Sequence, residues 1–182
     1  MLTITKWKFM PVLSSLIKTI NNLCSENNKK IVIKSGSMTA NVTVSSLLAL
    51  ARSIEKSIDL DLSIYSISVS YGAGFFPKVP WIAITRKGKT VSNSASVALC
   101  FAKTGEGFVC GAMFHKRKED GLYQTINRSG KHIILEGGSP KNNYTNKYFN
   151  PLDFYDGYTN AHELIAHIKS SIEFMNTING DK

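Results

Sequence analysis

Two histidines near the C-terminus, His162 and His167, flank a glutamate and suggest the helix of a zinc protease. In that class of enzyme the metal-binding histidines lie four residues apart and share one face of the helix. Here they are five residues apart, about 140° around a helix of 3.6 residues per turn. We therefore expect two surface histidines and no metal site.

The other motifs that mark enzymes are also missing from the chain. There is no GxxxxGK[ST] phosphate loop and no GxSxG nucleophile turn. Residues 105–107, Gly-Glu-Gly, are too short for a dinucleotide fingerprint and are typical of a hairpin turn. No cysteine or histidine stands in a nucleophile–base pattern, and no Asp is followed by the Glu-x-Lys of a metal-dependent nuclease. The sequence predicts a binding protein without catalytic residues and without a cofactor.

A glycine-aromatic segment, YGAGFFPKVPWIAI over residues 71–84, is the most informative stretch. Gly72 and Gly74 permit unusual backbone angles and a close approach to a ligand. Aromatic side chains beside such a loop, Trp81 above all, can stack on a nucleobase. The alternative is a plain hairpin connection whose aromatic residues fold into the core. From the residues alone, the two interpretations are equally supported.

The net charge favours a polyanionic partner. Among 182 residues, 22 Lys and Arg stand against 13 Asp and Glu, a formal net charge of +9. Binding of a nucleic acid to such a chain would release counterions and would weaken with salt. The alternative is a solvated basic surface without a partner, and charge alone does not decide between them.

Composition places the chain among folded proteins. Apolar residues make up 43% and charged residues 19% of the chain, and no apolar run approaches the length of a membrane-spanning helix. Three cysteines without CxxC spacing, and an N-terminus without a signal-peptide pattern, predict a cytoplasmic protein.

The hydrophobic periodicity predicts helices at both ends of the chain and strands between them. Helices are expected from about Phe9 to Leu23, from Ser45 to Ile58 with Thr43 or Ser45 as cap, and from Asn160 to Met175. Strands are expected over residues 31–33, 62–71, 79–86, 96–103, 108–114 and 133–135. The segment 137–158 is expected to be mostly loop. Short connections favour an antiparallel meander. We predict one α+β domain over residues 1–182, a mostly antiparallel central sheet flanked by N-terminal and C-terminal helices.

Residues 68–84, SVSYGAGFFPKVPWIAI, resemble the signature of the McrB N-terminal DNA-binding domain family. That family carries a Gly-x-Gly-aromatic loop followed by a Val/Ile-Pro-Trp-Ile/Phe-Ala strand. The resemblance continues through the apolar strands around Ser96–Phe101 and Phe108–Cys110, and covers roughly residues 62–115. It implies recognition of modified cytosine in duplex DNA by base flipping, in a restriction system with an AAA+ GTPase motor and a nuclease subunit.

The resemblance also implies roles for individual residues. Trp81 would form the wall that stacks on the extruded base, Cys100 and Ser96 would line the pocket, and Tyr148 or Tyr144 would complete the sandwich. The loop Tyr71, Gly72, Ala73, Gly74, Phe75 and Phe76 would enter the DNA. We further expect phosphate contacts from basic residues near the loop and in the turns: Lys78, Arg86, Lys87, Lys89, Lys116, Arg117 and Lys118.

Two departures from the family pattern bear on this mechanism. Ala73 stands between the loop glycines, where a relative has an intercalating tyrosine, so Tyr71, Phe75 or Phe76 would have to act as the wedge. Cys100 replaces a leucine and makes the expected pocket roomier. Two other functions remain open: a nonspecific DNA- or RNA-binding module, and a protein-interaction domain of a defence system.

Overall fold

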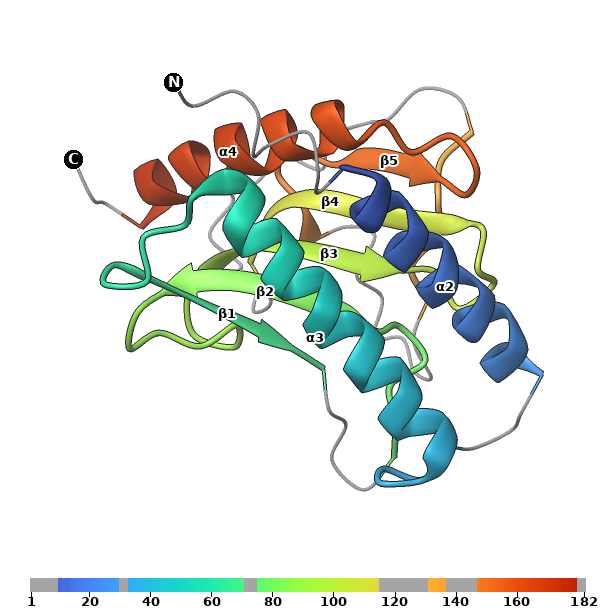
Figure 1. The fold of residues 1–182 in the computed structure, drawn as a ribbon. Coiled ribbons are helices and arrows are strands. Elements are labelled where there is room, and N and C mark those ends of the chain that lie inside the picture. Colours follow the sequence, from blue (N-terminus) through green and yellow to red (C-terminus); the bar gives the residue numbers. More distant parts are fainter. Residues whose placement is uncertain (1–9, 30–32, 71–74, 115–130, 137–146, 180–182) are drawn as a thin grey trace.

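The computed structural model describes residues 10–29, 33–70, 75–114, 131–136 and 147–179. Five strands form one antiparallel sheet in chain order (Figure 1): β1 (Tyr65–Val69), β2 (Trp81–Arg86), β3 (Ala95–Phe101), β4 (Gly107–Phe114) and β5 (Leu152–Tyr155). Three helices are described: α2 (Met10–Asn28), α3 (Met38–Ile58) and α4 (Ala161–Ile178). The α+β class, with helices before and after an antiparallel sheet, is therefore confirmed.

All three helices cover the same face of the sheet. Because side chains alternate along a strand, every second residue of β2, β3 and β4 points toward the helices. The larger apolar cluster joins these residues to the helices, and its fully buried members include Leu13, Leu47, Leu99, Phe108 and Leu164. The Phe108 ring is in contact with those of Phe101 and Phe154, at centroid distances of 5.0 and 5.1 Å. This cluster is the main core.

The opposite face of the sheet carries a second apolar cluster, to which none of the described helices contributes. Residues of the alternate register, among them Ala83, Ala98 and Val109, are covered there by Ile133, Leu135 and Tyr148. The two covering segments come from far along the chain. This face bears the residues that the family resemblance singles out.

The ends of the helices differ from the predicted ones. Helix α3 begins at Met38 rather than Ser45, because the Ser37 side chain accepts a hydrogen bond from the Ala40 amide and caps the helix there. Helix α2 continues to Asn28, past the predicted end at Leu23 and into the polar residues that follow it. Its buried stripe contains Leu13, Ile17, Ile20 and Cys24, whereas Val12 is exposed.

Strand β5 was not predicted. Leu152–Tyr155 pairs with β4 inside a segment whose Gly, Asn and Pro content indicated loop. Conversely, Ile133 and Leu135 are buried but belong to no strand, and the predicted strand over residues 31–33 lies mostly outside the described residues. Edge pairing depends on the partner strand more than on local propensity, and this explains both differences.

The helices of the described part of the chain give no sign of a membrane span. None combines the length and the apolar character that crossing a bilayer requires.

Candidate nucleic-acid interface

Trp81 is the first residue of β2, and its backbone is firmly positioned. Its amide donates to the Ser70 hydroxyl at 3.0 Å, and its carbonyl accepts from the Ser70 amide at 2.9 Å. The preceding Pro80 carbonyl accepts from the Phe101 amide at 2.8 Å. The Pro-Trp step is thus held between β1 and β3. The indole is half-buried and packs against the second cluster, on the face away from the helices.

Small side chains pave the sheet beside this indole. Ala83, Ala98, Cys100 and Ala102 share the face with Trp81, and Gly111 is the register partner of Ala98 on β4. Large apolar residues of the same strands point toward the helices instead. The small side chains next to Trp81 therefore leave room above the backbone for a flat group. In this structure the side chain of Tyr148 covers that floor.

Cys100 lies at the centre of this arrangement. It is the register partner of Trp81 across β2 and β3, and the Tyr148 hydroxyl reaches its thiol from the other side. Burial raises the pKa of the Cys100 thiol to about 12, against the smaller opposing effects of Tyr148 and Lys147. The thiol is therefore neutral and acts as a small apolar lining, not as a nucleophile.

Tyr148 covers the floor in this structure. Its hydroxyl donates to the carbonyls of Ala98 at 3.3 Å and Val109 at 3.2 Å, and its backbone bridges Met113. Both bonds are long for a hydroxyl donor, so each is weak. With Tyr148 in place, Cys100 is only 2% exposed. Tyr148, which the resemblance implies as a wall of the pocket, thus closes that pocket in this structure.

The other two expected lining residues fall outside this group. Ser96 is buried on the same face, but Ala98 separates it from Cys100. Four residues of strand span about 13 Å, so Ser96 does not line the floor beside Trp81. Tyr144 lies outside the described residues.

Only part of the expected inserting loop is described, since Tyr71, Gly72, Ala73 and Gly74 lie outside the described residues. Phe75 is 61% exposed and forms an antiparallel bridge with Lys34. Phe76 is buried in the main core, and its amide donates to the Ile33 carbonyl at 2.8 Å. The expectation that Phe76 enters DNA is therefore corrected, because withdrawing it would open the core.

The expected phosphate contacts are divided between the two ends of β2. Lys78 is exposed in the turn before Trp81. Arg86, Lys87 and Lys89 follow the other end of the strand, about 17 Å away for five residues of strand. Arg86 also points to the helix side, where its guanidinium lies over the Tyr65 ring at 5.7 Å and donates to Asn176. These three residues therefore do not flank Trp81, and of the four only Lys78 lies at its end of the strand.

Sequence reasoning missed the cation nearest to the pocket. Lys147 precedes Tyr148, and burial lowers the pKa of its ammonium group while the nearby Cys100 acts in the opposite direction. Lys34, opposite Phe75, is a second cation at this end. No pattern in the sequence marks Lys147, which reaches the site only because the neighbouring Tyr148 bridges to the distant Met113. Lys116, Arg117 and Lys118 lie outside the described residues.

The two C-terminal histidines do not come together. His162 is exposed at the start of α4, whereas the His167 Nε2 lies 3.0 Å from the Cys110 carbonyl, with the ring near Phe154. Within the described ranges, no group of three His, Cys, Asp or Glu side chains is placed to hold a metal ion.

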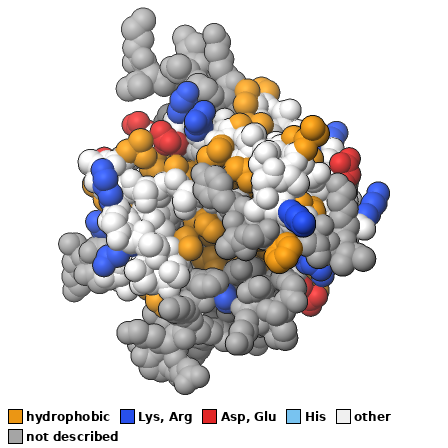
Figure 2. Space-filling model, turned by 90° about the horizontal axis from the view of Figure 1, so that it is seen from below, with side chains coloured by type: hydrophobic (Ala, Val, Ile, Leu, Met, Phe, Trp, Pro, Cys, Tyr) orange, Lys and Arg blue, Asp and Glu red, His pale blue; other side chains and the backbone are white. Residues whose placement is uncertain are grey.

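Neither family models, nor curated proteins, nor solved structures match this chain. The site must therefore be interpreted from its own geometry. Figure 2 views the molecule from below relative to Figure 1 and shows apolar side chains interspersed with Lys, Arg and acidic side chains among the described residues.

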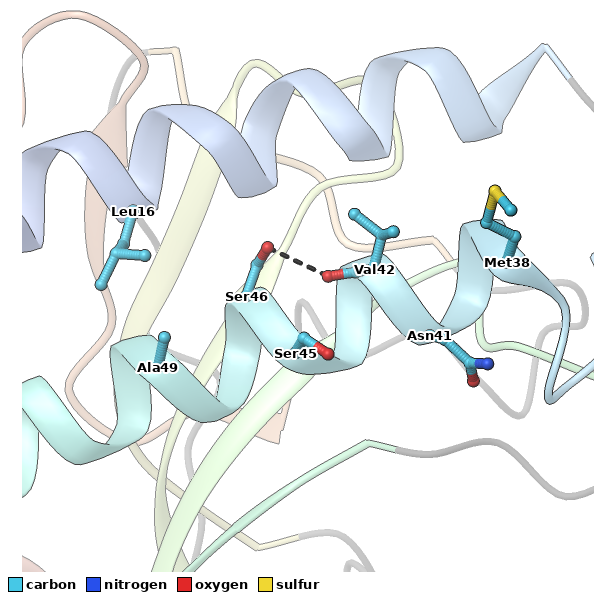
Figure 3. A pocket seen from close by; sticks show the side chains of 7 residues that line it. All are labelled: Leu16, Met38, Asn41, Val42, Ser45, Ser46 and Ala49. Atoms are coloured by element: carbon cyan, nitrogen blue, oxygen red, sulfur yellow. Dashed lines mark hydrogen bonds between the residues drawn. The ribbon is translucent and has the colours of Figure 1, made fainter.

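A separate apolar groove of about 610 Å³ runs between α2 and α3. Figure 3 shows Leu16 of α2 facing Ala49 of α3, with Met38 at the far end of the groove. The Ser46 hydroxyl is occupied by the Val42 carbonyl at 3.0 Å. No charged side chain lines this groove, so it lacks the groups that hold a phosphate.

Proposed function

We propose that this chain is a cytoplasmic DNA-binding specificity domain that recognises modified cytosine in duplex DNA within a modification-dependent restriction system. The resemblance of residues 62–115 motivates this proposal. One observation supports it above all: Trp81 and Tyr148 reach the small Cys100 side chain from its two sides, on the sheet face that carries none of the three described helices.

Extrusion of the base is the reasonable way to read such a modification. A modified cytosine still pairs normally and shows only a small added group in the major groove, whereas an extruded base can be enclosed by a pocket. Flipping costs a few kcal/mol of lost stacking and pairing. Stacking on an aromatic ring returns about 1–3 kcal/mol per base. Trp81, fixed by Ser70 at the end of β2, is the residue that we assign to this contact.

The closed pocket implies that Tyr148 moves when a base enters. Tyr148 would then give up its two long hydrogen bonds to the carbonyls of Ala98 and Val109. The displaced ring would then stack on the free side of the base, and Cys100 would face the base edge. Phe75, exposed beside the loop, replaces Phe76 as the candidate for the gap left in the duplex, since apolar wedges of several kinds enter a base stack.

The domain acts as a reader without catalysis of its own. In this proposal the GTPase motor and the nuclease belong to other domains or subunits, and the domain needs no cofactor. Its expected DNA partner is a duplex, because base flipping takes the modified cytosine out of paired DNA and the pocket then reads it.

The direct test is a binding panel of matched duplexes at one fixed salt concentration. The duplexes carry cytosine, 5-methylcytosine, 5-hydroxymethylcytosine or N6-methyladenine at one position, with a fluorescent base analogue beside it to report extrusion. We expect at least one modified cytosine to bind more tightly than plain cytosine and to raise the reporter signal. Equal affinities across the panel would indicate a nonspecific nucleic-acid module, and no binding near physiological salt would favour a protein-interaction domain.

The variant Trp81→Ala tests the assigned wall. We expect the ratio of affinities for modified and plain DNA to fall roughly 5- to 150-fold. This corresponds to about 1–3 kcal/mol of binding free energy, because the lost contact is a stacked base. Affinity for the plain duplex should change little, and a thermal melt of the variant controls for folding. Parallel loss of both affinities in a folded variant would show that Trp81 is not a base-stacking wall.

A further inference from the structure

A polar cavity of about 700 Å³ lies where the end of β5, the β3–β4 turn and helix α2 meet. Its walls are joined by hydrogen bonds: the Asp156 amide donates to the Glu106 carbonyl at 2.9 Å, and the Asn21 side-chain amide donates to the Asp156 carboxylate at 2.9 Å. The Tyr155 hydroxyl donates to the Lys131 carbonyl at 3.0 Å. The cavity is thus preformed, and its size suits a ligand group of moderate size.

The charge of this cavity is opposite to that of the chain. Among the described residues of its lining, Glu106 and Asp156 are acidic and Lys131 is basic, which gives them a formal charge of −1 in a chain of +9. Such a site repels phosphate and attracts a cation that donates hydrogen bonds.

An aromatic ring stands at the edge of the cavity with little packing of its own. Tyr158 is 88% exposed, and its position follows from a turn in which its amide donates to the Tyr155 carbonyl at 3.1 Å. A large exposed ring next to carboxylates is a suitable surface for a planar cation, which stacks on the ring while its N–H groups meet the carboxylates.

We propose that this cavity binds an arginine side chain presented by a protein partner. A guanidinium group fits the three features together: it is positively charged, planar, and able to donate to Glu106 and Asp156 at once. A lysine ammonium would satisfy the charge but would not stack on Tyr158 in the same way. The proposal does not depend on DNA binding, because its ligand is a cation. The carboxylates repel a phosphate backbone from this cavity.

The test is an amide NMR titration of the full chain with N-acetyl-arginine amide, using N-acetyl-citrulline amide as the uncharged isostere. N-acetyl-lysine amide, cytidine and guanosine complete the set of probes. We expect the arginine probe alone to give saturable shifts at residues 104–106 and 155–158, with the lysine probe clearly weaker. Equal shifts from citrulline, stronger shifts from a nucleoside, or the absence of saturation would each overturn the proposal.

Two variants make the result specific to this cavity. Glu106→Gln should raise the Kd for the arginine probe roughly threefold, as expected for one partly exposed charge pair, and Tyr158→Ala should raise it roughly two- to fivefold through loss of ring stacking. Glu173→Gln, an exposed acid in the second half of α4, is the matched control and should leave the Kd unchanged. Equal Kd values for all three variants and the parent chain would refute the assignment.

Discussion

At the scale of single residues, the environment of Cys100 explains why a thiol can line a binding site without reacting. Burial keeps its pKa near 12 against an ordinary value of 9.0, so at pH 8 the thiolate fraction falls roughly a thousandfold. Tyr148 provides part of this burial from the side opposite Trp81. The same contact makes the reactivity of Cys100 a measure of whether Tyr148 is in place.

Thiol labelling of Tyr148→Ala tests this arrangement. With DTNB at pH 8, the native parent chain should label very slowly, because Cys24, Cys100 and Cys110 are all buried. The variant should gain one fast equivalent, since removal of the ring uncovers Cys100. Circular dichroism checks that the variant is folded, and Tyr148→Ala with Cys100→Ser should lose the fast equivalent. An unchanged labelling rate in the single variant would mean that Tyr148 does not cover the thiol.

At the scale of secondary structure, the start of α3 shows how one cap extends a helix. The apolar stripe of this helix predicted a start near Ser45, but the helix begins two turns earlier because Ser37 satisfies the Ala40 amide at 3.3 Å. The C-terminal end is set by Asp59, which adopts a left-handed conformation at φ 57° and donates its amide to the Glu55 carbonyl.

Substitution of the two candidate caps distinguishes the observed start from the predicted one. Ser37→Ala should lower the free energy of unfolding by about 1 kcal/mol through loss of the cap. Ser45→Ala is the matched control: Ser45 is exposed inside the helix, where alanine is favoured, so stability should stay the same or rise slightly. Urea denaturation measures both. A greater loss for Ser45→Ala than for Ser37→Ala would place the start of the helix at the predicted position.

At the scale of the whole molecule, the sheet carries the main core on one face and the second apolar cluster on the other. Helices α2, α3 and α4 bury one face in the main core, as Figure 1 shows, whereas among the described residues Ile133, Leu135 and Tyr148 cover the other. The two ends of β2 carry different lysines: Lys78 lies at the end with Trp81, whereas Lys87 and Lys89 lie at the far end. Under the proposed function, the DNA backbone should follow the Trp81 end.

Salt titration of two lysine variants tests which end DNA contacts. Lys78→Ala should weaken binding to modified and plain duplexes alike and should reduce the slope of log K against log salt by about 0.9, the effect of one lost phosphate contact. Lys89→Ala, an equal change of charge at the far end, should leave the slope as it was. The reverse pattern would place the DNA at the turn after β2.

The sequence by itself determined the class of fold and most of its elements. The period of two in β1 to β4 and the apolar stripes of the three helices are local signals, and the backbone follows them. It did not predict β5, whose residues form a strand because β4 offers unpaired backbone groups beside them. The cap at Ser37 was not predicted either, because the apolar pattern of the helix begins well after it.

Tertiary structure decided which residues meet. The family resemblance named Trp81, Cys100 and Tyr148 as neighbours, but alternation along a strand assigns a residue only to a face, and the register of β2 against β3 sets Trp81 beside Cys100. Tyr148 arrives from 48 positions further along the chain, through a bridge to Met113. Tertiary packing also withdrew Phe76 into the core, since long-range packing, not local pattern, determines whether an aromatic residue beside a loop is free to bind.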